Sequence, residues 1–141
     1  MVVYVKMNFW ETAAYTFHNF SEPFLQFGKV SLKNLDIITI YRSQDEPFIR
    51  VAHFLKGFIN LEKTTLIVGD FNYCAARDTN DLSTFLTRQK FDQLVTLPTH
   101  IKGGLLDHAH LRQSKGHKKN TEVTTFTHYF SDHDSVAVIL R

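Results

Sequence analysis

Short apolar runs rich in β-branched residues recur along the chain and predict strands. Residues 27–31 and 35–41 are joined by a short polar turn, which predicts an antiparallel hairpin. Residues 64–68 are almost wholly apolar and are bounded by Gly69, as is typical of a strand buried in the middle of a sheet. Further strands are predicted at residues 1–6, 94–97, 105–111, 121–129 and 135–140.

Two other segments carry apolar residues at the three- and four-residue spacing of an amphipathic helix. The first follows Pro47 and runs from residue 48 to about residue 60. The second follows the polar, helix-capping stretch 78–81 and ends near Gln89. The order of strands and helices predicts a mixed α/β (α+β) fold, a two-sheet β-sandwich flanked by helices. The absence of a repeat or a linker in the sequence predicts one domain.

Composition narrows the class of protein only slightly. The chain has 141 residues, of which 43% are hydrophobic, so a packed core is expected rather than disorder. The formal net charge is +2, so binding of a polyanion would depend on local sites. The single cysteine, Cys74, cannot form an internal disulfide, and no signal peptide precedes the first strand, which predicts an intracellular location, nucleus or cytoplasm. The apolar runs are far too short for a membrane helix.

Polar residues at the end of the predicted central strand form the first candidate site. Gly69-Asp70-Phe71-Asn72 follows directly on residues 64–68. In an extended chain, Asp70 and Asn72 would point to one face and Phe71 into the core. A carboxylate beside an amide offers an oxygen ligand for Mg²⁺ or Mn²⁺ and a partner for a phosphate or a water. The alternative is an Asx turn after a strand.

Two more motifs bring ionisable groups to the ends of apolar strands. Leu106-Asp107-His108 places a carboxylate at a strand position, where it needs a partner, and His133 is one candidate. Ser131-Asp132-His133-Asp134 precedes residues 135–140, so that Asp132 could bind a metal while His133 acts on a phosphate. For the first of these motifs the alternative is a surface Asp-His pair on an edge strand. For the second it is a solvated turn. Together the three motifs supply the parts of metal-assisted phosphodiester hydrolysis.

Other residues have simpler interpretations. The basic loop at residues 112–119 could meet a nucleic-acid backbone, although a solvated loop is equally consistent with it. His108 and His110 alternate on a strand, but no third ligand at metal-site spacing supports zinc. Cys74 lacks a neighbouring base and is not expected to be a nucleophile.

In this order, Gly69-Asp70-Phe71-Asn72, Leu106-Asp107-His108 and Ser131-Asp132-His133 resemble the three C-terminal signatures of the endonuclease/exonuclease/phosphatase superfamily. Tyr41-Arg42-Ser43 resembles the tyrosine motif of its retrotransposon-type and apurinic-site endonucleases. The resemblance extends from about Val2 to Arg141. It implies a metal-dependent phosphodiester hydrolase, a DNA endonuclease domain of transposon origin, with DNA as partner and no membrane association.

The resemblance also implies a role for each residue. Asp70 would position or activate the attacking water, and Asn72 would hold the water or the phosphate. Asp107 would orient His133, which would contact the scissile phosphate. Asp132 would be a metal ligand, and Tyr41 would contact the phosphate. Thr99-His100 would form a structural turn. The cofactor would be Mg²⁺ or Mn²⁺.

The N-terminal part of the chain departs from the superfamily pattern. Members carry an early asparagine and then a glutamate that is a principal metal ligand, and no counterpart precedes Tyr41 here. Glu11 lies too close to Tyr41 to replace that glutamate. We therefore expect residues 1–141 to form a partial, N-terminally truncated domain with impaired activity. The alternatives are a catalytically inactive remnant or binding module of the same fold, and an enzyme for another phosphate ester such as a phosphoinositide, a sphingolipid or a nucleotide.

Overall fold

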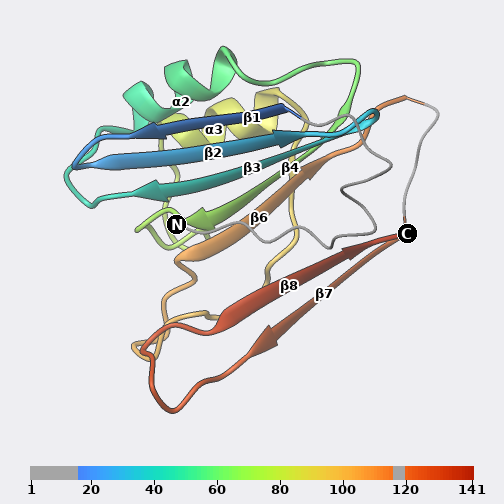
Figure 1. Ribbon diagram of the computed structural model, residues 1–141. Helices are drawn as coiled ribbons and strands as arrows, with labels where there is room; N and C mark the ends of the chain where they lie inside the picture. Colours follow the sequence, from blue (N-terminus) through green and yellow to red (C-terminus); the bar gives the residue numbers. More distant parts are fainter. Residues whose placement is uncertain (1–15, 116–119) are drawn as a thin grey trace.

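The computed structural model describes residues 16–115 and 120–141, which form two β-sheets and two helices (Figure 1). The six-stranded sheet has the order β1-β2-β3-β4-β6-β5, and the two-stranded sheet pairs β7 with β8. Helices α2 and α3 cover one face of the large sheet, and the small sheet packs on the opposite side (Figure 1). This arrangement confirms the predicted mixed sandwich. The elements are β1 (Thr16–Ser21), β2 (Leu25–Ser31), β3 (Leu35–Arg42), α2 (Phe48–Lys56), β4 (Thr64–Asp70), α3 (Asp81–Arg88), β5 (Asp92–Gln93), β6 (Asp107–Arg112), β7 (Thr121–Phe126) and β8 (Ser135–Leu140).

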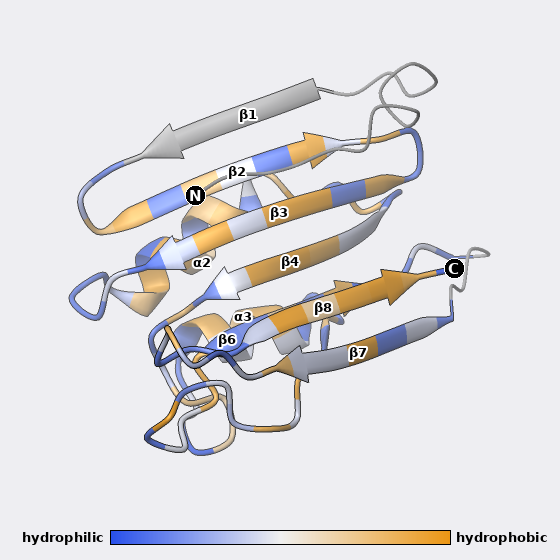
Figure 2. Ribbon diagram, turned by 60° about the horizontal axis from the view of Figure 1, so that its bottom comes forward, coloured by the Kyte–Doolittle hydropathy of each residue, from blue (hydrophilic) through white to orange (hydrophobic). Residues whose placement is uncertain are grey.

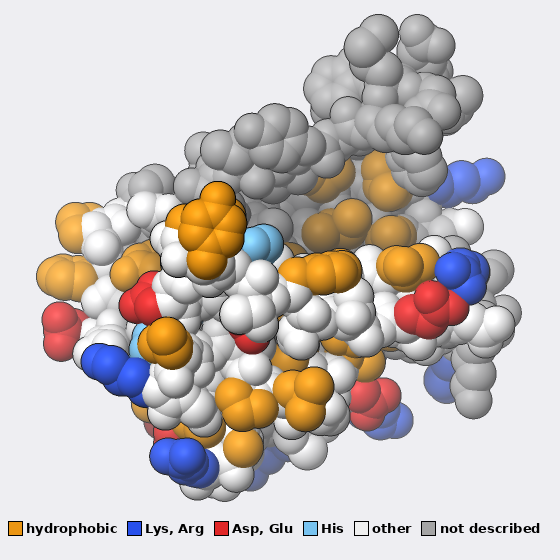
Figure 3. Space-filling model, turned by 90° about the horizontal axis from the view of Figure 1, so that it is seen from below, with side chains coloured by type: hydrophobic (Ala, Val, Ile, Leu, Met, Phe, Trp, Pro, Cys, Tyr) orange, Lys and Arg blue, Asp and Glu red, His pale blue; other side chains and the backbone are white. Residues whose placement is uncertain are grey.

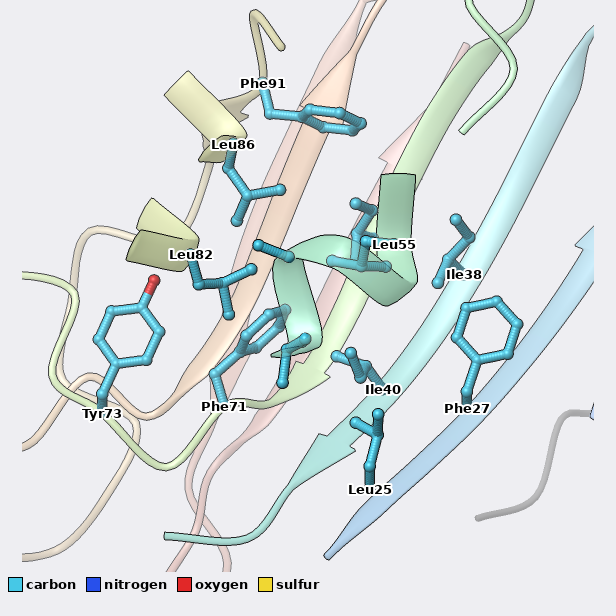
Figure 4. Packing of buried hydrophobic residues seen from close by; sticks show 13 residues of the cluster. Leu25, Phe27, Ile38, Ile40, Leu55, Phe71, Tyr73, Leu82, Leu86 and Phe91 are labelled. Atoms are coloured by element: carbon cyan, nitrogen blue, oxygen red, sulfur yellow. The ribbon is translucent and has the colours of Figure 1, made fainter. Parts of the chain in front are cut away.

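The main core lies between the large sheet and the two helices (Figure 4). Ile38 and Ile40 of β3 point from the sheet toward Leu55 of α2, and α3 adds Leu82 and Leu86 from the side. All five side chains are fully or almost fully buried. Burial of an aliphatic side chain contributes about 1.5–3 kcal/mol, so this layer anchors the strands that carry the candidate site.

A second, smaller core joins the two sheets. Ala109 of β6 and Val68 of β4 meet Val123 of β7 and Val136 and Val138 of β8. Strands β4 and β8 are hydrophobic along most of their length (Figure 2), as expected for strands that face packed layers. The small sheet therefore packs against the part of the large sheet formed by β4 and β6.

Several predicted elements are confirmed. The hairpin is β2 and β3, paired antiparallel. The strand predicted at residues 64–68 is β4, which lies inside the sheet between β3 and β6, and the strand predicted at residues 135–140 is β8. The second helix is α3, where the side chain of Asn80 accepts a hydrogen bond from the Ser83 amide, a helix cap. The strand predicted at residues 1–6 lies outside the described residues.

The first helix is shorter than predicted. It ends at Lys56, and Gly57 follows it. Beyond this point the amides of Phe58 and Ile59 both bond to the carbonyl of Leu55, which makes a tight turn rather than another helical turn. Phe58 and Ile59 still pack on the core. Their apolar spacing therefore reflects burial, although the two residues lie outside the helix.

The strand predicted at residues 94–97 is wrong. The ladder here is only β5, Asp92–Gln93, which pairs with β6. The side-chain oxygen of Gln93 accepts a hydrogen bond from the amide of Ala109, and Val95 is buried in the smaller core without strand pairing. Leu97 is 62% exposed. Strand β7 is also shorter than predicted, since it ends at Phe126, and β1 was not predicted at all.

Gly69 allows β3 and β4 to lie close together just before the candidate site. Its φ is +148°, and a Cβ placed there would come within 1.8 Å of the carbonyl oxygen of Ile40. Any side chain would therefore push the two strands apart. The parallel pairing of β3 and β4 sets Tyr41 directly beside Asp70.

In the part of the chain that the structure describes, no helix has the length and apolar character needed to span a membrane.

Candidate active site

Three strands of the large sheet end in one row of polar residues. In the register of the sheet, Tyr41 of β3 pairs with Asp70 of β4, and Asp70 pairs with Asp107 of β6. Directly paired residues project from the same face of a sheet. Ala109 and Val68, which form another pair two residues further along, face the small sheet, so the row of Tyr41, Asp70 and Asp107 faces the same side.

His133 reaches this row from the segment before β8. Its Nδ1 lies 2.8 Å from an Oδ2 atom of Asp107, at hydrogen-bonding distance. A carboxylate only accepts, so Nδ1 carries the proton and Nε2 is left for chemistry. One ligand atom each of Asp70, Asp107 and His133 lie within 4.8 Å of one another. The convergence expected for these three residues is confirmed. Figure 3 shows this side of the molecule, where histidine and acidic side chains lie among exposed hydrophobic ones.

Burial and neighbouring charges shift the pKa values of Asp70 and His133. Burial raises the pKa of Asp70; the Asn72 amide lowers this pKa, and the charge of Asp107 raises it. Burial lowers the pKa of His133, but the hydrogen bond and the charge of Asp107, together with the charges of Asp70 and Asp132, outweigh burial, and the pKa is raised overall. Asp70 is therefore a stronger base than an ordinary carboxylate, and His133 holds a proton more readily than an ordinary histidine.

Asn72 is not in the extended conformation that was predicted. Its φ is +50°, and its amide donates to Oδ1 of Asp70 over 2.9 Å, which is an Asx turn. Its side-chain Nδ2 donates to the carbonyl of Arg42 over 2.8 Å and lies 3.4 Å from Oδ2 of Asp70. Because both contacts use the amide nitrogen, the Asn72 side chain links the ends of β3 and β4. Phe71 is fully buried, as predicted.

Tyr41 and Asp70 line one shallow pocket on the sheet. Gln26, Thr39 and Val68 are among its other lining residues, and its volume is about 330 Å³. The Tyr41 side chain is 37% exposed. A tyrosine at this position can reach a ligand held beside Asp70.

Asp132 lies near His133 but outside the group of Asp70 and Asp107. Its side chain is 68% exposed, and its Oδ2 lies 3.4 Å from Nε2 of His100. His100, Asp132 and His133 form a second group whose ligand atoms lie within 4.8 Å of one another. His133 thus belongs to both groups.

The turn before β6 holds these pieces together, and sequence reasoning recognised only part of it. The Thr99 hydroxyl accepts hydrogen bonds from the amides of Leu106 and Asp107, and its carbonyl accepts one from the amide of Asp134. Thr99 is therefore structural, as predicted. The backbones of His100 and His133 form an isolated β-bridge, so His100 enters the site. No local sequence signal marks His100, because its place depends on this bridge to His133.

His108 and His110 belong to the main core. The ring of His108 stacks on Phe71 at 4.7 Å, and Nε2 of His110 lies 3.3 Å from Nδ1 of His108. Burial lowers the pKa of His108 to about 4 and that of His110 to about 3. Nε2 of His108 donates to the carbonyls of Tyr73 and Leu105, so the pair is committed to internal hydrogen bonds.

In the basic loop, Arg112 donates to the carbonyls of residues 60, 61 and 63. Residues 116–119 of this loop lie outside the described residues.

Comparison with known proteins identifies the fold. No protein-family model matches the sequence, and no curated protein does. Among solved structures, the endonuclease domain of TRAS1, a telomere-specific non-LTR retrotransposon, aligns with a TM-score of 0.62 and 13% identity over 89% of this chain. The fold is DNase I-like. CdtB, the biologically active subunit of cytolethal distending toxin, aligns with a TM-score of 0.58 and 15% identity, again over 89% of this chain.

The DNase I-like fold agrees with the fold that the resemblance to the endonuclease/exonuclease/phosphatase superfamily implied. The chain spans 67% of the TRAS1 endonuclease domain and 56% of CdtB. At these sequence identities the likeness concerns the fold alone.

Proposed function

We propose that this chain is a metal-dependent phosphodiester hydrolase that acts on DNA, an endonuclease domain of transposon origin. The observation that carries the proposal is the hydrogen bond of 2.8 Å between Asp107 and His133, with Asp70 beside it at the end of β4. A carboxylate that orients an imidazole, next to a second carboxylate, is an arrangement suited to general acid–base chemistry. The two structural neighbours, a retrotransposon endonuclease domain and a toxin subunit, are compatible with it.

In this proposal, each residue has one task in attack on a phosphate. Asp70, whose pKa is raised by burial, positions the water and accepts its proton. His133 donates Nε2–H to the phosphate, and Asp107 holds the imidazole and stabilises its charged form. Tyr41 donates its hydroxyl to a phosphate oxygen. Asn72 holds the Asp70 carboxylate in place and does not contact the phosphate, since its side-chain Nδ2 bonds to the Arg42 carbonyl and to Asp70.

The donor set fits a hard divalent cation. Asp132 is largely exposed, and Asp70 offers a second carboxylate in the other group that includes His133. Carboxylate oxygens are the ligands that Mg²⁺ and Mn²⁺ prefer, so Asp132 would hold the ion. A bound ion would supply positive charge to stabilise the charge that develops on the phosphate.

An inactive or weakly active domain of the same fold is the second candidate. The observation that favours it is that, within residues 16–115 and 120–141, no glutamate joins either group around His133. Asp107 already serves His133, so few carboxylates are left for an ion, and we expect slow turnover by this chain. The assignment of residues 1–141 to part of a larger domain stays a prediction.

The test is nicking of supercoiled plasmid by the 141-residue chain in the presence of Mg²⁺ or Mn²⁺. Wild type is compared with His133→Ala and with His53→Ala, whose exposed histidine lies on α2 on the far side of the large sheet. Slow nicking that only His133→Ala abolishes supports the hydrolase. Absence of nicking, together with specific retention of DNA, would favour the binding module. Nicking that His133→Ala leaves unchanged would exclude the proposed site.

A further inference from the structure

The ring of His100 is held in one orientation and one tautomer. The amide of Lys102 donates to Nδ1 of His100 over 3.1 Å. A ring nitrogen that accepts a hydrogen bond carries a lone pair, so in the neutral ring the proton resides on Nε2. The ring also meets His133 edge to face, with centroids 4.8 Å apart and planes at 86°. Its side chain is only 13% exposed.

The fixed tautomer argues against a metal at the group of His100, Asp132 and His133. To bind an ion, Nε2 of His100 would need a lone pair, and the proton would move to Nδ1, where it would face the Lys102 amide. The Nδ1 of His133 is engaged by Asp107, so only its Nε2 remains as a ligand. This group therefore offers a hydrogen-bond donor where a zinc site needs a ligand.

The donor on Nε2 is only weakly used. Its contact with Oδ2 of Asp132 is 3.4 Å, longer than an ordinary N–H···O hydrogen bond. Asp132 is 68% exposed and lies on a turn, where its side chain can change rotamer. The His100 ring, in contrast, is fixed by the Lys102 amide and by His133. A rigid N–H beside His133 is suited to an oxyanion, because a preorganised donor needs no reorganisation when charge develops.

We propose that His100 is a second phosphate-contacting histidine of the site, which donates Nε2–H to a non-bridging oxygen of the substrate phosphate next to His133. The assignment rests on the proposed function and adds to it a second hydrogen-bond donor beside His133. It also gives the turn at residues 99–104 a direct part in substrate binding.

Two variants separate the donor from packing. His100→Gln keeps an N–H close to the place of Nε2, whereas His100→Phe keeps an aromatic ring against His133 and has no donor. We expect His100→Phe to weaken binding of a 12-nucleotide phosphorothioate DNA duplex in EDTA about tenfold, as for a lost hydrogen bond to a charged group, and to slow nicking at least as much. His100→Gln should stay within about threefold of wild type.

The tautomer is measured separately, by long-range ¹H–¹⁵N spectra of the histidine rings in wild type. A proton on Nε2 of His100 supports the proposal, and a proton on Nδ1 overturns it. Equal effects of the Gln and Phe variants, whether both are damaged or both resemble wild type, also overturn it, because then the donor does not matter. If wild type neither binds the duplex nor nicks plasmid, the proposed function itself has failed. If wild type does both, the comparison of variants decides the role of His100 alone.

Discussion

Asp107 and His133, 26 positions apart in the sequence, meet through a hydrogen bond of 2.8 Å between the carboxylate and Nδ1. One residue begins β6 of the large sheet, and the other precedes β8 of the small sheet. The pair therefore fixes the orientation of the imidazole relative to Asp70 on the neighbouring strand. This relationship gives the most direct prediction about activity.

We expect Asp107→Asn to lower nicking activity about 10²- to 10⁴-fold, the range for loss of a positioned acid or base. An amide can donate to Nδ1 and so favours the wrong tautomer of His133. The pKa of His133, followed by NMR, should fall in this variant because the hydrogen bond and the charge of Asp107 raise it in wild type. The double variant with His133→Ala should be no worse than His133→Ala alone. Additive losses would show that the two residues act independently.

Acid should destabilise the fold through the buried histidine pair. The pKa is lowered to about 4 for His108 and about 3 for His110, while the unfolded chain titrates near pH 6.5. The unfolded state therefore binds more protons below pH 6.5, and the free energy of unfolding falls by about 1.4 kcal/mol per pH unit for each histidine down to about pH 4. His133 has the opposite sign, since its raised pKa stabilises the fold below pH 6.5 and this contribution disappears as the pH rises through its folded pKa.

Urea unfolding at pH 7, 6, 5 and 4 measures this slope. The variant His108→Gln/His110→Phe should have a flatter pH dependence, whatever its stability at pH 7. His53→Gln is the control, because His53 is exposed on α2 and its removal should leave the slope unchanged. An equal slope in wild type and in the double variant would assign the acid sensitivity to other groups.

Gly69→Ala should destabilise the protein by about 3 kcal/mol, from backbone strain and overpacking together. Its Cβ would lie 1.8 Å from the Ile40 carbonyl oxygen, at a φ of +148°. Gly57→Ala is the matched control, since its Cβ would make an ordinary contact of 3.5 Å with the carbonyl oxygen of Phe54 in right-handed backbone. Equilibrium unfolding in urea compares the two. Similar stabilities of the two variants would mean that β3 and β4 can separate at little cost.

Affinity for Mg²⁺ should be weak. A hard cation needs several oxygen ligands, and around His133 the described residues offer Asp70 and Asp132, with Asp107 engaged by the imidazole. Calorimetric titration should give a shallow isotherm that Asp132→Asn weakens further. Asp92→Asn, which removes an exposed carboxylate on β5, should have no effect. Tight, stoichiometric binding by wild type would require ligands beyond these.

The sequence predicted elements well where local pattern and burial agree. Strand β4 is apolar because it lies between β3 and β6. Helix α3 begins at Asp81, directly after the N-cap residue Asn80. The strand prediction at residues 94–97 failed because the side chain of Gln93 takes the place of a backbone partner for the Ala109 amide. Val95 is buried although it pairs with no strand. Pattern alone does not distinguish burial in a strand from burial in a loop.

The candidate site was predictable in its acidic residues and less so in their conformations. Asp70, Asp107 and His133 were expected together because each follows or begins an apolar run, and the structure brings them together. The left-handed backbone of Asn72 could not be predicted from spacing, because it depends on the Arg42 carbonyl, 30 positions earlier. His100 was missed because its position depends on a backbone bridge to His133 rather than on any local motif.

The two layers of the sandwich have a consequence for how this protein would lose activity. The contact between Asp107 and His133 crosses from the large sheet to the segment that leads into β8, and the apolar core that joins the two sheets there, around Ala109, is small. The main core between the sheet and the helices is larger and does not include β7 or β8. On mild heating, the small sheet should therefore detach while the helix-covered layer stays folded. Catalysis would then stop several degrees before the loss of helical circular dichroism.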